Sequence, residues 1–501
     1  MSKSITTSCV ATSSANQSLT RHTAYYFVGR IATGLVGLLT LVAFTRVLDP
    51  EDYGRYSVVI AIVGFISGVG FQWLRQCLVR FGTGVSGTRQ PLLGTLGVLL
   101  FCLLLIVALA GVIIPVVASK GWTNFTVSLS ESATICILVA TQAWFELTAD
   151  ASRTEFRPWR YSIATLIRAI SSLVLGVMAA LWLQSVWAVL LAMAAAYGLA
   201  SAFAAPRWLF GVLLVHQANV VEARKLAAYG LPLASTLGLT FILDSADRLM
   251  LASMAGYAEA GVYSSAYNLA QFSIGTVLIG LGLGSFPLAV DASNESNKVR
   301  TEELLRSNLT LSLAIGLPAI VGLVMLAPSL DHLLLGNYVA GKSDMVTMIV
   351  AVAIGLAAIR SYCVDVVFML YQRTWLQTIV IGSSAVLNVG LNWVWIPLWG
   401  SIGAALATLA AFLYAFVGSW WLSQRYLRIT ISIRDLGKIS FASAVMVAVI
   451  AVLPPSTGSW IGLTATIFCG LLTYIILMLA LNAAGSRLRL QIFFRTRFRS
   501  E

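Results

Sequence analysis

The stretch DPEDYGRYS at residues 49–57 has a counterpart far along the chain, GYAEAGVYS at residues 256–264. At a constant offset of 207 positions the two share an acidic, a glycine and a tyrosine position: Asp52 and Glu259, Gly54 and Gly261, Tyr56 and Tyr263. A weaker echo pairs SVWAVLLAMAAA at 185–196 with GSIGAALATLAA at 400–411. The sequence therefore predicts two similar halves, each containing one copy of this motif.

The residues around both copies are strongly apolar. The chain of 501 residues is 58% hydrophobic and 10% charged, with a mean hydropathy of +0.87, whereas a soluble domain has about a quarter charged residues. A membrane-crossing helix needs about 20 mostly apolar residues. Fourteen such segments are centred near Leu35, Phe65, Leu104, Leu138, Leu173, Met193, Leu239, Ile274, Leu317, Ile354, Ala385, Leu409, Val447 and Ile467.

The expected fold is therefore all-α, a polytopic membrane protein of about 14 transmembrane helices in two similar six-helix bundles plus a C-terminal helix pair. Both motif copies follow an odd-numbered segment, so the halves should have the same orientation, and transporters often bind substrate between such halves. The expected boundaries are a disordered cytoplasmic tail at 1–24, halves at 25–215 and 216–428, the extra pair at 429–483 and a basic cytoplasmic tail at 484–501.

The distribution of basic residues predicts the orientation. With the N-terminus in the cytoplasm, 24 of the 32 Lys and Arg residues fall in cytoplasmic segments. The opposite loops hold Arg46, Arg55, Lys120, Arg248 and Lys342. Both termini are therefore expected in the cytoplasm, and the net charge of +12 is explained by the anionic inner leaflet without a nucleic-acid partner.

A full match to the phosphate-binding pattern G-x-x-x-x-G-K-[ST] occurs at residues 336–343, GNYVAGKS. A working P-loop follows a strand and opens a helix in a soluble α/β domain, whereas LAPSLDHLLL, the end of an apolar segment, precedes this match. We therefore interpret it as a turn and expect no ATP. The six cysteines form no C-x-x-C, and His22, His216 and His332 are far apart, so no metal or other cofactor is expected.

The acidic residues of DPED allow two interpretations. Membrane glycosyltransferases that use lipid-linked sugars have acidic residues in an early external loop. Asp49 and Pro50 also fit a helix start, as cap and first-turn residue, with Glu51 and Asp52 beside the positive helix end. The second copy lacks Asp49 and no large external domain is present, so the cap interpretation is favoured and no catalytic residue is assigned.

Several stretches, in order along the chain, resemble those of bacterial polysaccharide flippases. They are FTRVLDPEDYGRYS after the first segment, DRLMLASMAGYAEAGVYSSAYNLA at 247–270, LLLGNYVAGKSD, and LNVGLNWVWIPLWGSIGAALATLAAF at 387–412. The resemblance extends to O-antigen flippases. These flippases belong to a superfamily that also contains multidrug antiporters and lipid II flippases. The resemblance implies a non-enzymatic inner-membrane protein that moves undecaprenyl-pyrophosphate-linked oligosaccharide units outward, for O-antigen, capsule or exopolysaccharide synthesis. It also suggests partners among polymerase and export components.

Such a substrate requires cations that can meet a diphosphate inside the membrane, and arginine grips phosphate oxygens bidentately. The candidates for substrate binding are Arg30, Arg168, Arg360 and Arg248. The candidates for ion coupling or pairing are Asp244, Asp247 and Asp365, of which Asp244 is one helical turn from Arg248. The mechanism expected is alternating access about a cationic cavity. The alternative is a structural role, in which these arginines snorkel to the membrane interface or pair with aspartates on neighbouring helices. Glu146 and Asp150, near Arg153 and Arg157, are expected to form a solvated cluster.

Two other functions compete with the flippase hypothesis. An antiporter for cationic drugs, from the same superfamily, needs an unpaired carboxylate in the first half, where this chain has Arg30 instead. A membrane glycosyltransferase or polymerase would need a long external loop, which the sequence lacks. The antiporter is therefore the first alternative and the enzyme the second.

Overall fold

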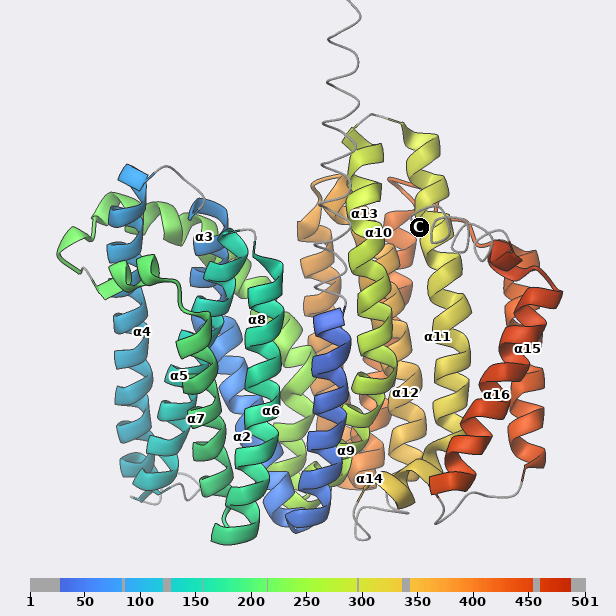
Figure 1. Cartoon of the computed structure of the whole chain (residues 1–501), viewed down its shortest axis with the longest axis horizontal. Coiled ribbons are helices and arrows are strands. Elements are labelled where there is room, and N and C mark those ends of the chain that lie inside the picture. Colours follow the sequence, from blue (N-terminus) through green and yellow to red (C-terminus); the bar gives the residue numbers. More distant parts are fainter. Residues whose placement is uncertain are drawn as a thin grey trace, which may run out of the picture. The chain divides into compact units, whose positions relative to one another are not determined.

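The computed structural model describes residues 28–82, 86–119, 128–155, 157–213, 215–294, 297–335, 343–453 and 460–487. Within these ranges the chain is helical and contains no strand (Figure 1). Contacts divide it into two compact units, Met1–Leu249 and Met250–Glu501. The first contains the helix Val28–Val47, α2 (Pro50–Ile66), α3 (Gln72–Phe81), α4 (Ser86–Ser119), α5 (Leu129–Thr154), α6 (Pro158–Leu183), α7 (Val186–Ala204) and most of α8 (Val220–Met254). The second contains α9 (Tyr257–Ala270), α10 (Thr276–Asn294), α11 (Lys298–Leu334), α12 (Asp344–Ile359), α13 (Val366–Leu370), α14 (Thr374–Ser423), α15 (Ile433–Val452) and α16 (Trp460–Ala480).

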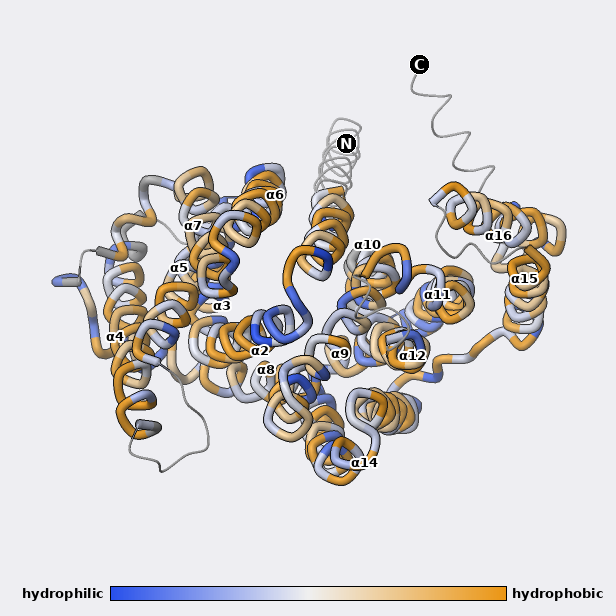
Figure 2. The backbone as a smooth tube through the Cα atoms, turned by 90° about the horizontal axis from the view of Figure 1, so that it is seen from below, coloured by the Kyte–Doolittle hydropathy of each residue, from blue (hydrophilic) through white to orange (hydrophobic). Residues whose placement is uncertain are grey.

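Twelve helices in the described part of the chain are long and apolar enough to cross a membrane. Figure 2 shows hydrophobic residues on helices of both units. Two more of the expected crossings are explained by the geometry. The two arms of α14 form a hairpin, and α9 and α10 form one long helix that is continuous through the residues Gln271–Gly275. The prediction of an all-α polytopic membrane protein with about 14 helices is confirmed.

The hairpin in α14 turns at Gly400, whose φ of 56° and ψ of −130° are non-helical. The two arms are antiparallel, so each contact between them joins residues that lie at similar distances before and after the turn. Ser384 Oγ donates to the Ala411 carbonyl at 2.7 Å, and a Cβ on Gly403 would lie 2.2 Å from the Trp395 carbonyl oxygen. Glycine at 403 is therefore needed for the close approach just after the turn.

Three membrane helices of the described chain contain a π-turn, in which the backbone bonds skip to i+5. The π-turns are Ser67–Phe71 between α2 and α3, Gln271–Gly275 between α9 and α10, and Arg360–Val364 between α12 and α13. The first two lie in the helices that begin with the repeated motif. The two motif copies therefore open helices that share this irregularity.

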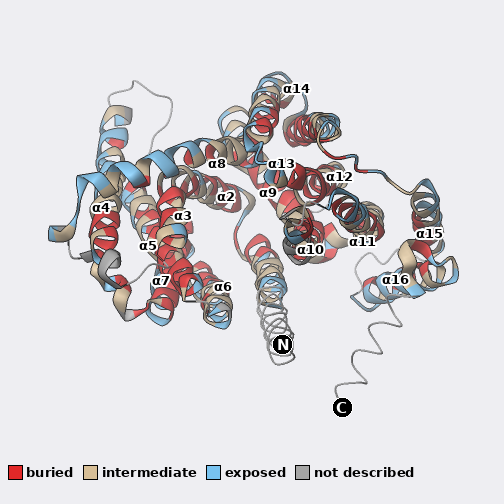
Figure 3. Ribbon diagram, turned by 90° about the horizontal axis from the view of Figure 1, so that it is seen from above, coloured by how far each residue is buried: buried red, intermediate tan, exposed pale blue. Residues whose placement is uncertain are grey.

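Each unit has its own packing core (Figure 3). In the first unit Trp73, Leu78 and Leu209 belong to one buried cluster that joins α3, α4 and α8. In the second unit α15 and α16 pack on α11 through a cluster that includes Met446 and Tyr474. The Tyr474 hydroxyl donates to the Ala314 carbonyl of α11 at 2.6 Å. The C-terminal pair is thus fixed to the second unit by both packing and a buried hydrogen bond.

Candidate functional site

Arg360 and Asp365 form an ion pair inside the second unit. In a regular α-helix, residues five apart point about 140° away from each other. Here Arg360 opens the π-turn, and the Asp365 amide donates to the Arg360 carbonyl at 2.8 Å. The wider turn brings both side chains to one face, where Arg360 Nε lies 3.4 Å from Asp365 Oδ2. The π-turn therefore makes this pair possible.

The pair is almost completely buried, with 6% and 0% of the two side chains exposed. Asn308 of α11 donates to the Tyr362 carbonyl at 3.0 Å and so satisfies a backbone group within the π-turn. Gln377 of α14 donates to Asp365 Oδ2 at 3.4 Å. Three helices thus hold the pair in place.

The hydrogen bonds around this pair are incomplete. In the described part of the chain, Nε and Nη1 of Arg360 and Oδ1 of Asp365 have no hydrogen-bond partner. The remaining donation by the guanidinium, from Nη2 to Ser361 Oγ, is long at 3.4 Å. Because buried polar groups are nearly always satisfied, this guanidinium retains the capacity to bind an anionic oxygen.

Arg168 lies in an aromatic setting in the first unit. Its guanidinium carbon is 5.5 Å from the ring centre of Tyr197 on α7 and 5.9 Å from that of Phe145 on α5, and the side chain also hydrogen-bonds Tyr197. Arg168 and Arg248 both act electrostatically on the Tyr56 hydroxyl. Two of the predicted arginines thus lie within electrostatic range of Tyr56, a tyrosine that the sequence marked only as a repeat position.

The other candidates lie in more varied surroundings. Arg30 is exposed on the helix Val28–Val47, and Asp244 is exposed on α8. Asp247 is fully buried and Arg248 is half-buried, one residue further along the same helix. The structure therefore places one of the four predicted arginines, Arg360, deep inside its unit and Arg30 on the surface.

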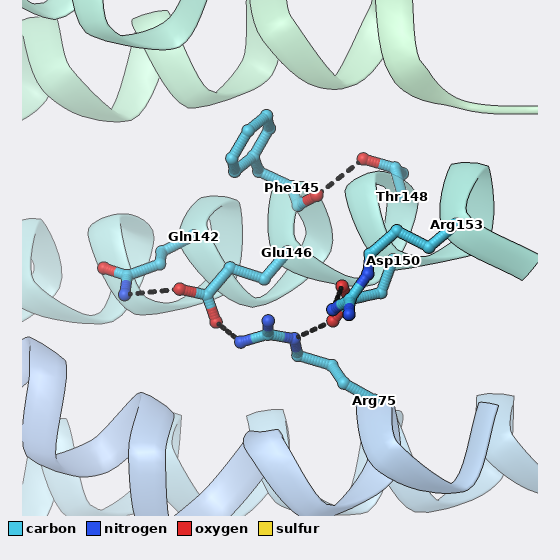
Figure 4. A network of polar contacts seen from close by, with 7 residues as sticks. All are labelled: Arg75, Gln142, Phe145, Glu146, Thr148, Asp150 and Arg153. Atoms are coloured by element: carbon cyan, nitrogen blue, oxygen red, sulfur yellow. Dashed lines mark hydrogen bonds and ion pairs between the residues drawn. The ribbon is translucent and has the colours of Figure 1, made fainter. Parts of the chain in front are cut away.

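A charge network joins α3 to α5 through Arg75, a residue that the sequence did not single out (Figure 4). Arg75 donates from Nη1 to Glu146 at 2.5 Å and from Nε to Asp150 at 2.8 Å. Arg153 donates to the other oxygen of Asp150 at 3.0 Å, and Gln142 donates to Glu146 at 3.1 Å. The expected cluster of Glu146, Asp150 and Arg153 is present, but Asp150 is not solvated as expected, because it is 1% exposed and is held between two arginines.

The motif residues have identifiable structural roles. Asp49 caps α2 by accepting from the Asp52 amide at 2.8 Å, with Pro50 in the first turn, so the cap interpretation of DPED is confirmed. In the second copy, Glu259 accepts from the Ser401 amide at 3.1 Å, just after the α14 turn. The Tyr263 hydroxyl is 2.9 Å from Thr408 Oγ1. The second copy thus fastens α9 to the α14 hairpin.

Of the GNYVAGKS segment only Ser343 lies within the described residues. It donates to Asp331 of α11 at 2.5 Å, and Thr347 of α12 donates to the same oxygen at 3.2 Å. Long helices, α11 and α12, lie on either side of the segment. A P-loop follows a strand, so this context does not match one.

Comparison with known proteins places the sequence in a family. The model of the family described as polysaccharide biosynthesis protein matches residues 43–340, more than half of the chain. No curated protein matches the sequence.

Among solved structures, the lipid II flippase MurJ in its inward closed conformation aligns with a TM-score of 0.74 at 14% identity, covering 91% of this chain and 98% of that one. A Vibrio cholerae MATE transporter, VcmN, aligns with a TM-score of 0.57 at 13% identity, covering 83% and 98%. A transporter of the MOP superfamily from Pyrococcus furiosus aligns with a TM-score of 0.57 at 15% identity, covering 81% and 95%. The likeness shows a shared fold, and the chain belongs to the polysaccharide biosynthesis protein family, with the fold of the MOP superfamily.

Proposed function

We propose that this protein is a flippase that moves undecaprenyl-pyrophosphate-linked oligosaccharide units from the inner to the outer leaflet of a bacterial plasma membrane. The units would feed O-antigen, capsule or exopolysaccharide synthesis, with both chain termini in the cytoplasm. The family match and the flippase-like fold support a role in polysaccharide export. The observation that carries the proposal is the buried guanidinium of Arg360, whose Nε and Nη1 make no hydrogen bond within the described residues.

The substrate explains why such a group would be kept inside a membrane helix. A charge at the bilayer centre is costly, and ionisable residues there usually serve function. A diphosphate offers several anionic oxygens to which an arginine can donate two parallel hydrogen bonds. The isoprenoid tail needs no such group, because it remains in lipid. Arg360 is therefore suited to the charged part of the substrate, the diphosphate.

The first unit offers a second set of cations for the same task. Arg168 is positioned by the rings of Tyr197 and Phe145, and Arg248 acts on the same Tyr56 hydroxyl as Arg168. Aromatic neighbours hold a guanidinium without neutralising its charge. We propose that Arg168 and Arg248 contact the phosphates and that the exposed Arg30 contacts the substrate as it enters the protein.

The mechanism proposed is alternating access. We propose Asp365 for ion coupling, because it contacts Arg360, a proposed substrate-binding arginine, directly. When the diphosphate competes with Asp365 for Arg360, the carboxylate is released to take up a proton or another cation. Substrate binding and ion binding would then be linked through one guanidinium.

The test uses purified protein in liposomes with a fluorescent undecaprenyl-diphosphate oligosaccharide. The proposal predicts protein-dependent loss of substrate from the outer surface, measured with an external quencher or glycosidase, and no dependence on ATP. Empty liposomes and liposomes containing an unrelated membrane protein serve as controls. Uptake of an organic cation under a proton gradient, without glycolipid movement, would contradict the proposal and support a drug antiporter.

A further inference from the structure

The two arms of the α14 hairpin enclose an apolar groove of about 610 Å³. Ile379 and Ser383 line it from the first arm, and Ala410, Gly418 and Leu422 line it from the second. Val417 and Trp421, also in the lining, are 56% and 61% exposed. The groove is therefore open on the side of Val417 and Trp421, and no side chain of the described residues fills it.

The length of the groove matches one leaflet of a bilayer. The lining on the second arm runs from Ala410 to Leu422, which corresponds to about 18 Å of helix. Half of the hydrocarbon core is about 15 Å thick. The volume of the groove is also within the range of about 300–1,000 Å³ that holds one small molecule. A single fatty acyl chain fits both dimensions, whereas an undecaprenyl chain is longer than one leaflet.

The end of the groove away from Gly400 is basic. Arg425 follows the last lining residue by about one turn, and its guanidinium carbon is 4.2 Å from the Trp421 ring centre. In the described part of the chain Arg425 makes no ion pair, and Arg373 near the same end of the hairpin is exposed. Arginine and tryptophan together are typical of the depth at which lipid headgroups lie.

We propose that this groove is a binding site for an anionic phospholipid, with one acyl chain between the arms of α14 and the phosphate at Arg425. The site is separate from the Arg360–Asp365 pair and does not depend on the proposed flippase function. Its occupant is held by two features that ordinary boundary lipid lacks, a groove of leaflet length and a cation fixed at its mouth. The bound chain would fill the space between the two arms and so stabilise the hairpin.

Native mass spectrometry of the full-length protein, delipidated in detergent and titrated with palmitoyl-oleoyl phosphatidylglycerol, tests the site. Wild type should retain one phosphatidylglycerol more tightly than phosphatidylcholine with the same chains. Gly418→Leu should abolish this binding by filling the groove, since a Cβ at 418 meets Val380 at an ordinary 3.5 Å and the hairpin is not strained. Arg425→Gln should weaken it about fivefold, as expected for one basic residue at the headgroup.

Matched controls lie on the same hairpin. Gly390→Leu makes the same change on an exposed part of the first arm, where no other atom lies within 4 Å of the new Cβ. Arg428→Gln removes an exposed arginine outside the groove. Both should bind phosphatidylglycerol like wild type. Equal binding by Gly418→Leu and Gly390→Leu, or several equivalent lipids with no preference for phosphatidylglycerol, would overturn the proposal and leave boundary lipid only.

Discussion

Neutralising Asp365 should destabilise the protein far more than neutralising an exposed carboxylate. At 3.4 Å the pair attracts by about 5 kcal/mol with an effective dielectric constant of about 20. Asp365→Asn keeps the shape of the side chain but leaves the Arg360 charge buried without its partner, which costs about 3–5 kcal/mol. The double variant Arg360→Met with Asp365→Asn removes both charges and should recover most of that loss, because neither charge then needs to be desolvated.

The assay is unfolding in mixed micelles by a denaturing detergent, followed by loss of helix signal. Asp291→Asn, an exposed carboxylate on α10, is the control and should change the free energy of unfolding by less than about 0.5 kcal/mol. Two results would refute the reasoning. One is an Asp365→Asn protein as stable as Asp291→Asn. The other is a double variant whose loss of unfolding free energy is at least the sum of the losses in the single variants Arg360→Met and Asp365→Asn.

Three further predictions use the same unfolding assay. Arg75→Met should lower the free energy of unfolding by about 3–5 kcal/mol, because it leaves the buried Asp150 without its central cation. Arg153→Gln, at a half-exposed position, should lower it by less than about 1 kcal/mol. Equal losses in the two variants would contradict this prediction. Asp49→Ala should cost about 1 kcal/mol by removing the α2 cap, and no loss would show that the cap is dispensable. Gly97→Ala should lower the free energy of unfolding by more than about 1–3 kcal/mol, since the new Cβ would lie 1.9 Å from the Val212 carbonyl oxygen. Gly198→Ala, whose Cβ would have no neighbouring atom within 4 Å, should leave the free energy of unfolding unchanged or raise it. A larger loss for Gly198→Ala than for Gly97→Ala would contradict the packing.

The helices and their membrane character could be predicted from the sequence because both depend on composition and segment length. The α2 start could also be predicted, since Asp49 and Pro50 act within a single turn. These features are local or summed over many residues. They do not require knowledge of which helix lies beside which.

The contacts of the charged residues could not be predicted in this way. Arg360 and Asp365 are five residues apart, a spacing that does not pair on a regular α-helix, and the periodicity gave no sign of the π-turn that brings them together. Arg75 lies beyond the first π-turn, and the helix continues through that turn and brings Arg75 to Asp150. Both contacts depend on a π-turn, which a sequence pattern read with uniform helical geometry does not include.

The central claim is that the Arg360 guanidinium binds the diphosphate of a lipid-linked oligosaccharide. The most direct test is translocation of the fluorescent undecaprenyl-diphosphate oligosaccharide in liposomes by wild type and by the Arg360→Met, Asp365→Asn double variant, which is expected to be folded. We expect wild type to move the substrate and the double variant to fall to the level of empty liposomes. Translocation by the folded double variant at the wild-type rate would contradict the account.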